Sequence, residues 1–376
     1  MDLALNDIRL ENFRNHDSFK GGPFGSLNIF IGSNGAGKTN ILEGIQLITS
    51  LESFRNPKWD EVVRHGEEIS SINAHAKSDS RDLEIRLRIE KGKRRYFLNG
   101  KGKKSADLRA LIPSVLFNPD DLQLVKGNAE KRRDGLDSIG VQISTTYHDL
   151  RKEYQRSIRQ KNRLLQSQEI NSTLVDIWNE NICLIATSYV KHRLRLFILF
   201  RRNFLKEWSD LSPNLKVEIA YAPSWEIEKN FEVGEPDYKE EQLRERIGET
   251  IRFHKDAEIA AHRSLVGPHK DDIHIYLDGA DARKFASQGQ QRLIALAWKI
   301  AEMETIKEIT GQTPLLLLDD VLSELDHQKK ALLLDYLLKG NQTFITSTDI
   351  DAIDDRILSG ANIFKVGTDD GFKTGN

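Results

Sequence analysis

The feature that most constrains this chain is a short glycine-rich segment that ends in lysine and threonine. It fits the pattern G-x-x-x-x-G-K-[S/T] without a mismatch and consists of Gly32, Ser33, Asn34, Gly35, Ala36, Gly37, Lys38 and Thr39. An apolar run of strand length precedes it at residues 27–31, and apolar side chains at helical spacing follow it in residues 38–50. A strand, a glycine-rich turn and a helix in this order gather backbone N–H groups and a helix N-terminus around a phosphate. The segment therefore predicts a phosphate-binding loop.

The residue types in this loop also predict its chemistry. Glycines let successive N–H groups curl around phosphate oxygens, because no Cβ atom stands in the way. We expect Lys38 to contact the β- and γ-phosphates of a nucleotide and Thr39 to ligate Mg²⁺. The structural alternative is a chance glycine-rich turn that opens a helix, and the complete pattern with correct flanking elements weighs against it.

A second candidate segment lies near the end of the chain, where the leucine run at residues 315–318 is followed by Asp319 and Asp320. Such a run predicts a buried parallel strand, and ligands bind at the carboxyl ends of such strands. We expect Asp319 to hold Mg²⁺, through a water, and Asp320 to polarise the attacking water. Two carboxylates that cap the following turn are the alternative, and the phosphate loop elsewhere in the chain favours the metal-binding interpretation.

A third segment, Ser287-Gln288-Gly289-Gln290-Gln291-Arg292, stands directly before a long amphipathic helix. Ser287 by itself is a good helix N-cap, which is a purely structural role. However, Ser-x-Gly-x-Gln before a helix, followed by an apolar strand that ends in acids, is the order of elements in ABC-type ATPases. Residues 323–326 then occupy the place of the loop that crosses the dimer in that superfamily.

Taken together, these segments resemble the RecF family. The resemblance is carried by residues 286–292 and 317–326, and it is supported by residues 10–15 and by a Gly-Pro-His box at residues 267–272. It extends from residue 8 to about residue 349. The sequence departs from the family pattern at three places: His16 replaces a usual tyrosine, Ala129 a usual proline, and Asp134-Gly135 a basic-aromatic pair. The strand that contains Thr346 lacks the switch histidine of transporter ATPases, which RecF-like proteins also tend to lack.

The resemblance implies an α/β fold, namely an ABC-type P-loop ATPase head with a mixed sheet and flanking helices, plus an inserted, mainly helical lobe. It implies ATP and Mg²⁺ as ligands, a homodimer that forms on ATP, and DNA binding in recombinational repair with RecR and RecO as partners. It places Ser287 and Gly289 against the γ-phosphate held by the partner copy, so that Lys38, Asp320 and Ser287 form the catalytic set. Slow, DNA-stimulated hydrolysis is the expectation. The resemblance does not indicate a role for the Gly-Pro-His box. Asn118 is a candidate for the position of the family's glutamine loop.

The pattern of elements predicts a lobe that is split in sequence. Strand signals occupy residues 1–126 and return in residues 264–376, which together form the predicted ATPase lobe. Residues 127–263 form the predicted helical lobe, with an antiparallel helix pair at residues 145–166 and 172–208.

Candidate DNA contacts lie in the helical part of the chain, since the net charge of the whole protein is only −2. Residues 151–206 contain twelve Lys or Arg and four acidic residues. Arg156, Arg159 and Arg163 recur at spacings that place them on one helix face. Such a stripe suits sequence-independent contacts to phosphates. A solvated helix face is the alternative, and the resemblance favours DNA for the group.

The remaining features predict a cytoplasmic protein. The start of the chain lacks a signal-peptide pattern, and the most apolar helical run, residues 182–190, is far shorter than the ~20 residues that a bilayer requires. The lone cysteine, Cys183, stands among apolar residues and is expected to be a buried, inert thiol. Two other functions stay open: the ATPase subunit of another ABC system, and a nucleotide-binding scaffold that does not hydrolyse ATP.

Overall fold

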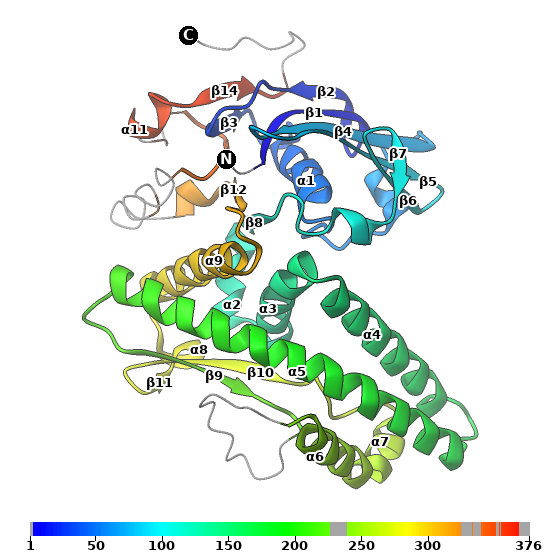
Figure 1. Cartoon of the computed structure of the whole chain (residues 1–376). Coiled ribbons are helices and arrows are strands. Elements are labelled where there is room, and N and C mark those ends of the chain that lie inside the picture. The colour runs from blue at the N-terminus through cyan, green and yellow to red at the C-terminus, as the bar shows by residue number, and fades with distance from the viewer. Residues whose placement is uncertain are drawn as a thin grey trace. The chain divides into compact units, whose positions relative to one another are not determined.

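The computed structural model describes residues 3–225, 239–324, 340–350 and 355–367, together with residues 333 and 353. The chain forms two compact units (Figure 1). The first unit comprises residues 1–121 and 306–376, and the second comprises residues 122–305. The sequence pattern predicts these boundaries at residues 126 and 263 instead. The second boundary differs because β10 (Asp272–Leu277) pairs with β9 (Val217–Ala222), which ties the segment after residue 263 to the second unit.

A five-stranded parallel sheet in the first unit carries the phosphate loop. Its strand order is β14-β3-β13-β12-β8, and every pair in it is parallel. The strands are β3 (Leu27–Ile31), β8 (Ser114–Phe117), β12 (Leu315–Asp319), β13 (Thr343–Ser347) and β14 (Asn362–Lys365). The strands predicted at residues 27–31, at residues 315–318 and around Thr346 are confirmed by β3, β12 and β13. Their carboxyl ends share one edge, which brings sequence-distant loops together.

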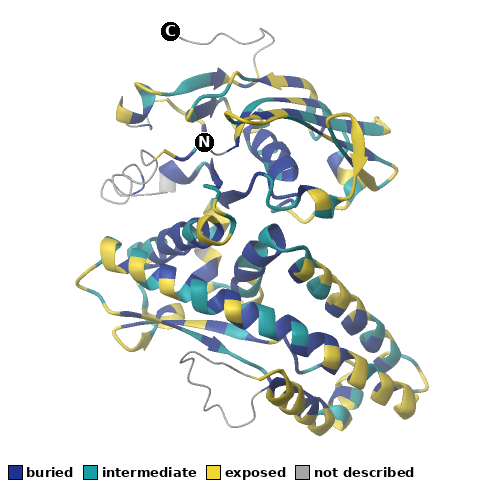
Figure 2. Ribbon diagram, viewed as in Figure 1, coloured by how far each residue is buried: buried dark blue, intermediate teal, exposed yellow. Residues whose placement is uncertain are grey.

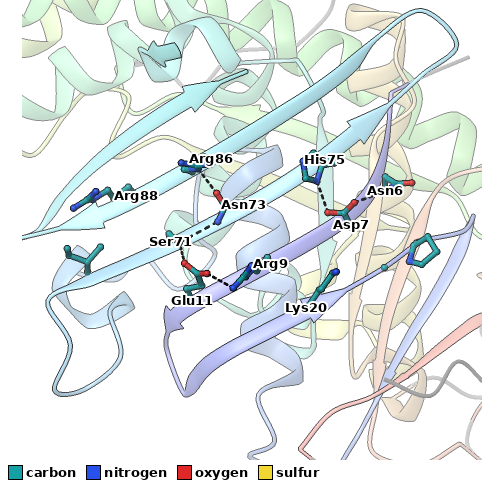
Figure 3. Close-up of a pocket in the computed structure, with 13 residues that line it drawn as sticks. Asn6, Asp7, Arg9, Glu11, Lys20, Ser71, Asn73, His75, Arg86 and Arg88 are labelled. Atoms are coloured by element: carbon teal, nitrogen blue, oxygen red, sulfur yellow. Dashed lines mark hydrogen bonds and ion pairs between the residues drawn. The ribbon is translucent and has the colours of Figure 1, made fainter. Parts of the chain in front are cut away.

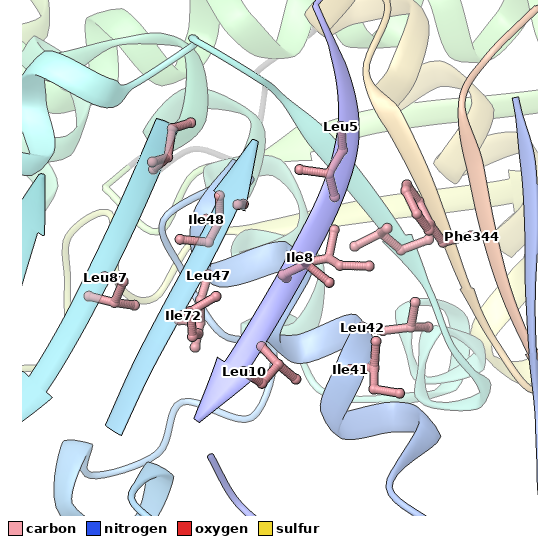
Figure 4. Close-up of a cluster of buried hydrophobic side chains, with 14 of the residues drawn as sticks. Leu5, Ile8, Leu10, Ile41, Leu42, Leu47, Ile48, Ile72, Leu87 and Phe344 are labelled. Atoms are coloured by element: carbon pink, nitrogen blue, oxygen red, sulfur yellow. The ribbon is translucent and has the colours of Figure 1, made fainter. Parts of the chain in front are cut away.

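An antiparallel sheet lies beside it in the same unit, in the order β2-β1-β4-β5-β6-β7. The strands are β1 (Ala4–Phe13), β2 (His16–Gly21), β4 (Ile69–Lys77), β5 (Asp82–Glu90), β6 (Lys93–Leu98) and β7 (Lys101–Lys103). Helix α1 (Lys38–Thr49) contacts strands of both sheets. The core therefore forms around α1, where Leu42 and Ile48 meet Ile8 of β1, Ile72 of β4 and Phe344 of β13 (Figure 4).

Short 3₁₀ helices in the first unit are η1 (Trp59–Val62), η2 (Ser105–Leu108), η3 (Pro119–Leu122) at its boundary, and η4 (Val321–Glu324). Helix α11 (Asp355–Leu358) precedes β14. The alternation of Leu83, Ile85, Leu87 and Ile89 predicts a half-buried strand, and β5 confirms it, because Ile85, Leu87 and Ile89 are buried.

The second unit is mainly helical. Its helices are α2 (Gln123–Lys126), α3 (Ala129–Ile143), α4 (Thr145–Leu165), α5 (Ser172–Leu211), α6 (Glu240–Phe253), α7 (Lys255–Ala261), α8 (Ala282–Phe285) and α9 (Gln288–Thr310), whose last turn extends past residue 305. A small sheet has the order β11-β10-β9, with β11 at Ala280–Asp281. Helices α4 and α5 are packed together and match the predicted helix pair within a few residues. No helix within the described ranges is both long and apolar enough to cross a bilayer.

Buried and exposed positions alternate along the helices of this unit (Figure 2). Two of the basic residues counted as candidate DNA contacts are at buried positions. Lys161 is buried in an ion pair with Glu258, and Arg193 is buried in an ion pair with Asp137. A buried cation requires a partner because leaving water costs several kcal/mol. The excess of basic residues in this part of the sequence therefore overstates the charge that the surface presents. Cys183, in contrast, is buried as expected.

Candidate nucleotide site

The predicted phosphate loop joins β3 to α1. Gly35 and Gly37 adopt φ angles of 83° and 99°, in the left-handed region that favours glycine. A Cβ atom on Gly37 would lie 2.5 Å from Nε2 of His16 and 2.6 Å from Oδ1 of Asn15. A Cβ atom on Gly32 would lie 2.5 Å from the carbonyl oxygen of Val366. The backbone of the loop thus has close neighbours at Gly32 and Gly37 and no room for larger residues there.

Lys38 begins α1 and is almost wholly buried, with 8% of its surface exposed. Its ammonium donates hydrogen bonds to the carbonyl oxygens of Gly32 at 2.7 Å and Ser33 at 2.9 Å. The side chain therefore folds back across the curve of the loop. This arrangement keeps the cation beside the loop, where a phosphate-binding role would require it.

The acidic pair meets this loop at the carboxyl edge of the parallel sheet. The Thr39 hydroxyl donates to Oδ1 of Asp319 at 2.8 Å, and the Thr346 hydroxyl donates to the same oxygen at 2.7 Å. Asp320 follows with a φ of 53°, and its backbone N–H donates to the Thr346 hydroxyl at 3.0 Å. Thus β12, β13 and the start of α1 bring Thr39, Asp319 and Asp320 together, while their roles toward Mg²⁺ and water stay predictions.

The turn between β1 and β2 holds the loop from the other side, which the sequence analysis did not foresee. Asn15 donates to the carbonyl oxygen of Gly35 at 3.3 Å, and Nε2 of His16 lies 3.1 Å from the carbonyl oxygen of Gly37. Burial lowers the pKa of His16, which favours its neutral form. The only sequence signal for this contact is the family-like stretch at residues 10–15.

An ion cluster fixes that turn to α1. Arg14 makes a bidentate pair with Glu43, at 2.9 and 2.7 Å, and Arg55 contacts the same carboxylate at 3.0 Å. The Ser53 hydroxyl donates to it as well, at 2.6 Å. Glu43 is fully buried, so this set of donors balances a charge that would otherwise be costly.

The polar face of the antiparallel sheet, which turns away from α1, carries a broad charged groove (Figure 3). Its contacts are internal to the face: His75 lies 2.8 Å from Asp7, Arg86 donates to Asn73 at 2.5 Å, and Ser71 donates to Glu11. None of the predicted site residues lies in this groove. This groove therefore lies apart from the candidate nucleotide site at the edge of the parallel sheet.

Asn118 directly follows β8 at the same edge of the parallel sheet. Its backbone N–H donates to Asp121, whereas its side-chain Oδ1 is buried and finds no hydrogen-bond partner among the described residues. Buried acceptors are rarely left in this state without a ligand or a water. The glutamine-loop role remains a prediction for Asn118.

Ser287 and Gly289 belong to the second unit. Ser287 caps α9 through a reciprocal pair: its hydroxyl accepts from the N–H of Gln290 at 3.2 Å, and its own N–H donates to Oε1 of Gln290 at 2.8 Å. The structural role of Ser287 is thereby confirmed, and its exposure leaves the side chain accessible to a partner. Within the predicted dimer-crossing segment, Leu325 and Asp326 lie outside the described residues.

The predicted DNA-binding stripe also lies in the second unit. Arg156, Arg159 and Arg163 are all exposed on α4. None of the three makes an ion pair with another described residue.

Comparisons with known proteins agree on one family. The RecF/RecN/SMC N terminal domain matches residues 4–365. The chain is 33% identical over 372 residues to the DNA replication and repair protein RecF of Geobacillus kaustophilus, which covers 97% of this chain and 98% of that protein. A second relative of the same name, from Heliobacterium modesticaldum, is 33% identical over 371 residues, covering 97% of each chain.

Solved structures give the same result. The recombination mediator protein RecF in its ATP form in the RecFOR pathway superposes with a TM-score of 0.86 and 29% identity, covering 98% of this chain and 97% of that one. An SMC head domain bound to the C-terminal winged-helix domain of ScpA shares the fold, with a TM-score of 0.54 and 16% identity over 98% of this chain and 95% of that one. The fold is thus the α/β ATPase head shared by RecF and SMC proteins, as the sequence predicted. The chain belongs to the RecF family.

Proposed function

We propose that this chain binds ATP and Mg²⁺ at the phosphate loop and uses them to clamp DNA during recombinational repair. The observation that carries the proposal is the 2.8 Å hydrogen bond between the Thr39 hydroxyl and Asp319. It joins the end of the phosphate loop to the acidic end of β12, which are 280 residues apart in sequence. A hydroxyl and a carboxylate beside a phosphate-binding loop form the Mg²⁺ site of P-loop ATPases.

The residues present fit the proposed ion. Mg²⁺ prefers hard oxygen ligands and is usually held by one or two protein groups, with water and phosphate oxygens completing its shell. Thr39 and Asp319 are such groups. Within the described residues no set of three or more His, Cys, Asp or Glu side chains could hold a metal, which also suits an ion that needs few protein ligands. When bound, Mg²⁺ would neutralise charge that develops on the phosphates.

Each residue of the candidate site then has a defined role in binding ATP or in hydrolysing it. Lys38 supplies a cation to the phosphates, and the N–H groups of the glycine-rich loop supply hydrogen bonds. Asp320, held in its left-handed conformation beside Thr346, orients and polarises the attacking water. Ser287 and Gly289 of a second copy would reach the γ-phosphate, so that two chains would together form one site. ATP binding would then favour formation of the homodimer.

The relatives supply the biological setting of the proposal. They are named for DNA replication and repair, and a solved relative is described as a mediator of the RecFOR pathway. We assign the same setting to this chain, with DNA, RecR and RecO as partners. Arg156, Arg159 and Arg163 are proposed to contact DNA phosphates without reading base sequence. Slow hydrolysis would then release the clamp.

Two other functions for the chain can be compared with the proposed clamp. A subunit of another ABC system would share the loop and the acidic strand, but the family membership extends over nearly the whole chain and argues against it. A scaffold that binds ATP without hydrolysing it would hold the nucleotide with the same residues, so that only turnover separates it from a clamp.

The test is ATP hydrolysis with and without duplex DNA, on the wild-type chain and on Asp320→Asn. The proposal expects slow turnover that DNA stimulates, and a large loss of turnover in Asp320→Asn with nucleotide binding retained, because the amide cannot polarise water as a carboxylate does. Nucleotide binding without any turnover in the wild-type chain would establish the scaffold instead.

A further inference from the structure

The Gly-Pro-His box is not part of the candidate nucleotide site. It forms one wall of a separate pocket in the second unit. This pocket has a volume of about 340 Å³ and lies among α3, α4, α5 and the box itself. Its charged and polar lining includes Arg133, Asp134, Arg151, Gln155, His269 and Lys270.

The box is a tight turn built to present His269. Gly267 has a φ of 122°, and a Cβ atom there would lie 2.4 Å from the hydroxyl of Tyr154. The missing side chain thus admits Tyr154, whose hydroxyl lies 2.6 Å from Nδ1 of His269. The carbonyl oxygen of Pro268 accepts a hydrogen bond from Arg193 at 2.6 Å, which anchors the turn to α5.

The ring of His269 lines this pocket. Its Nε2 is buried and makes no hydrogen bond of normal geometry within the described part of the chain, although the backbone of Ser264 lies close enough to the ring to raise its pKa slightly against the effect of burial. Burial lowers the pKa of His269 to about 3, so the ring is neutral near pH 7. When the Tyr154 hydroxyl donates to Nδ1, the neutral ring carries its proton on Nε2 and can donate to a ligand. Buried donors of this kind normally have a partner.

The charges of the lining leave a positive surplus. Asp137 pairs with Arg193 and Arg151, and Asp134 pairs with Arg151. Arg133 donates to the carbonyl oxygen of Asp271 and makes no ion pair with a described residue, although its charge acts on nearby Asp134. Lys270 is exposed and makes no ion pair with a described residue. These two cations face a single remaining acid of the lining, Glu130.

The pocket also adjoins the proposed DNA-binding stripe. Successive residues of a helix advance by about 100°. Taking buried Tyr154 as the origin, Arg151 and Gln155 lie at about 60° and 100° on α4, and Arg159 and Arg163 follow at about 140° and 180°. On α4, the side that lines the pocket is therefore directly next to the side that carries the arginine stripe.

From this geometry we propose that the pocket binds a phosphate group, with His269 and Lys270 as donors and Arg133 as a supporting cation. The phosphate belongs either to a DNA strand that runs along α4 or to a free phosphate compound. The DNA source rests on the proposed function, whereas the free source does not. The Gly-Pro-His box is then a device that positions a neutral histidine against the phosphate.

Two assays on the full-length chain test the proposal. The first follows binding of inorganic phosphate by ³¹P line broadening, without nucleotide or DNA. The second follows the affinity and salt dependence of duplex DNA binding by fluorescence anisotropy in the presence of ATP. Lys270→Gln removes a cation from the exposed mouth of the pocket. Lys216→Gln is the matched control, because Lys216 is also exposed, belongs to the same unit and does not line the pocket. His269→Leu, with folding checked by thermal melting, removes the buried donor.

A DNA phosphate in the pocket predicts a roughly tenfold weaker duplex affinity for Lys270→Gln and a salt slope reduced by about 1. A free phosphate in the pocket predicts line broadening that Lys270→Gln and His269→Leu reduce to the level that the phosphate loop alone gives, as set by the same variants combined with Lys38→Ala, with DNA affinity unchanged. In both cases Lys216→Gln should behave as the wild type. If Lys270→Gln and His269→Leu leave the phosphate broadening of the wild-type chain unchanged and Lys270→Gln binds duplex normally, the proposal is wrong, because the phosphate then binds elsewhere. Should no variant bind DNA at all, the proposed function fails, and the phosphate assay alone decides on the pocket.

Discussion

The hydroxyl of Thr346 lies 2.7 Å from Oδ1 of Asp319, and the same hydroxyl accepts a hydrogen bond from the backbone of the next acidic residue at 3.0 Å. One buried side chain on β13 therefore holds both acidic residues at the end of β12 in place. A single hydroxyl serves as donor and acceptor at once, which neither a valine nor an alanine can do.

Replacing Thr346 by Val should weaken Mg²⁺-dependent nucleotide binding, because Asp319 loses a donor while the side chain keeps its shape. A hydrogen bond to a charged group is worth roughly 1.5 kcal/mol, so the apparent Mg²⁺ affinity should fall about tenfold. The measurement is an Mg²⁺ titration of fluorescent ATP binding. Thr346→Ser keeps the hydroxyl and should bind as the wild type; equal losses in both variants would assign Thr346 a packing role only.

Reversing Arg156, Arg159 and Arg163 to Glu should weaken duplex binding and flatten its dependence on salt, since fewer counterions are released. ATP binding should not change. The matched control is Arg244, Arg252 and Arg263 to Glu, which alters net charge equally at other exposed positions of the same unit. If both triple variants lose the same affinity, the effect is one of overall charge, and α4 is not the contact surface.

His269 should make the chain less stable in mild acid. Burial, together with the charge of Lys270, holds its pKa at about 3 in the folded state, against roughly 6.5 in the unfolded chain. Between these values the unfolded state binds a proton that the folded state does not. Stability is therefore fully present above about pH 6.5 and is lost as the pH falls toward the lower pKa.

This loss has a measurable size. From pH 7 to pH 5 a histidine of this kind contributes about 2 kcal/mol of destabilisation. Urea denaturation at both pH values should show that much more loss for the wild type than for His269→Gln, which has no proton to bind. Identical pH profiles would mean that His269 titrates normally in the folded chain.

The sequence predicted those parts of the site that lie in short, continuous motifs. The phosphate loop, the acidic end of β12 and the cap of α9 each occupy a few neighbouring residues, whose types in that order suit few roles besides binding a phosphate, holding a cation or starting a helix. Contacts between residues that are distant in the sequence have no continuous motif from which they could be predicted. Asn15 and His16 reach the loop only because β1 and β2 form a hairpin beside it, and Thr346 reaches Asp319 only because β13 pairs with β12.

The same limit accounts for the errors in the predicted surface charge and unit boundaries. Lys161 and Arg193 look like surface cations in sequence, but their partners Glu258 and Asp137 are far away along the chain. The segment after residue 263 resembles a returning strand of the ATPase lobe, yet β10 pairs with β9 of the second unit. Periodicity identifies an element and its buried face, whereas it does not identify the partner.

A composite site predicts that two inactive variants restore activity when mixed. Lys38→Ala disables the phosphate loop of its own chain, and Ser287→Arg disables the signature that a chain lends to its partner. Random mixing gives about half mixed dimers with one working site each, so roughly a quarter of wild-type hydrolysis should return. Mixed dimers that form but do not hydrolyse ATP, together with full activity of Ser287→Arg alone, would show that each chain holds a complete site.

The most direct test of an ATP-driven clamp is duplex DNA affinity measured with and without ATP and Mg²⁺, for the wild-type chain and for Lys38→Ala. We expect ATP to tighten DNA binding of the wild type. Lys38→Ala should show only the weaker, ATP-independent affinity, because the phosphates lose their main cationic partner. Wild-type affinity that does not respond to ATP, or a Lys38→Ala chain that responds as the wild type does, would contradict the clamp.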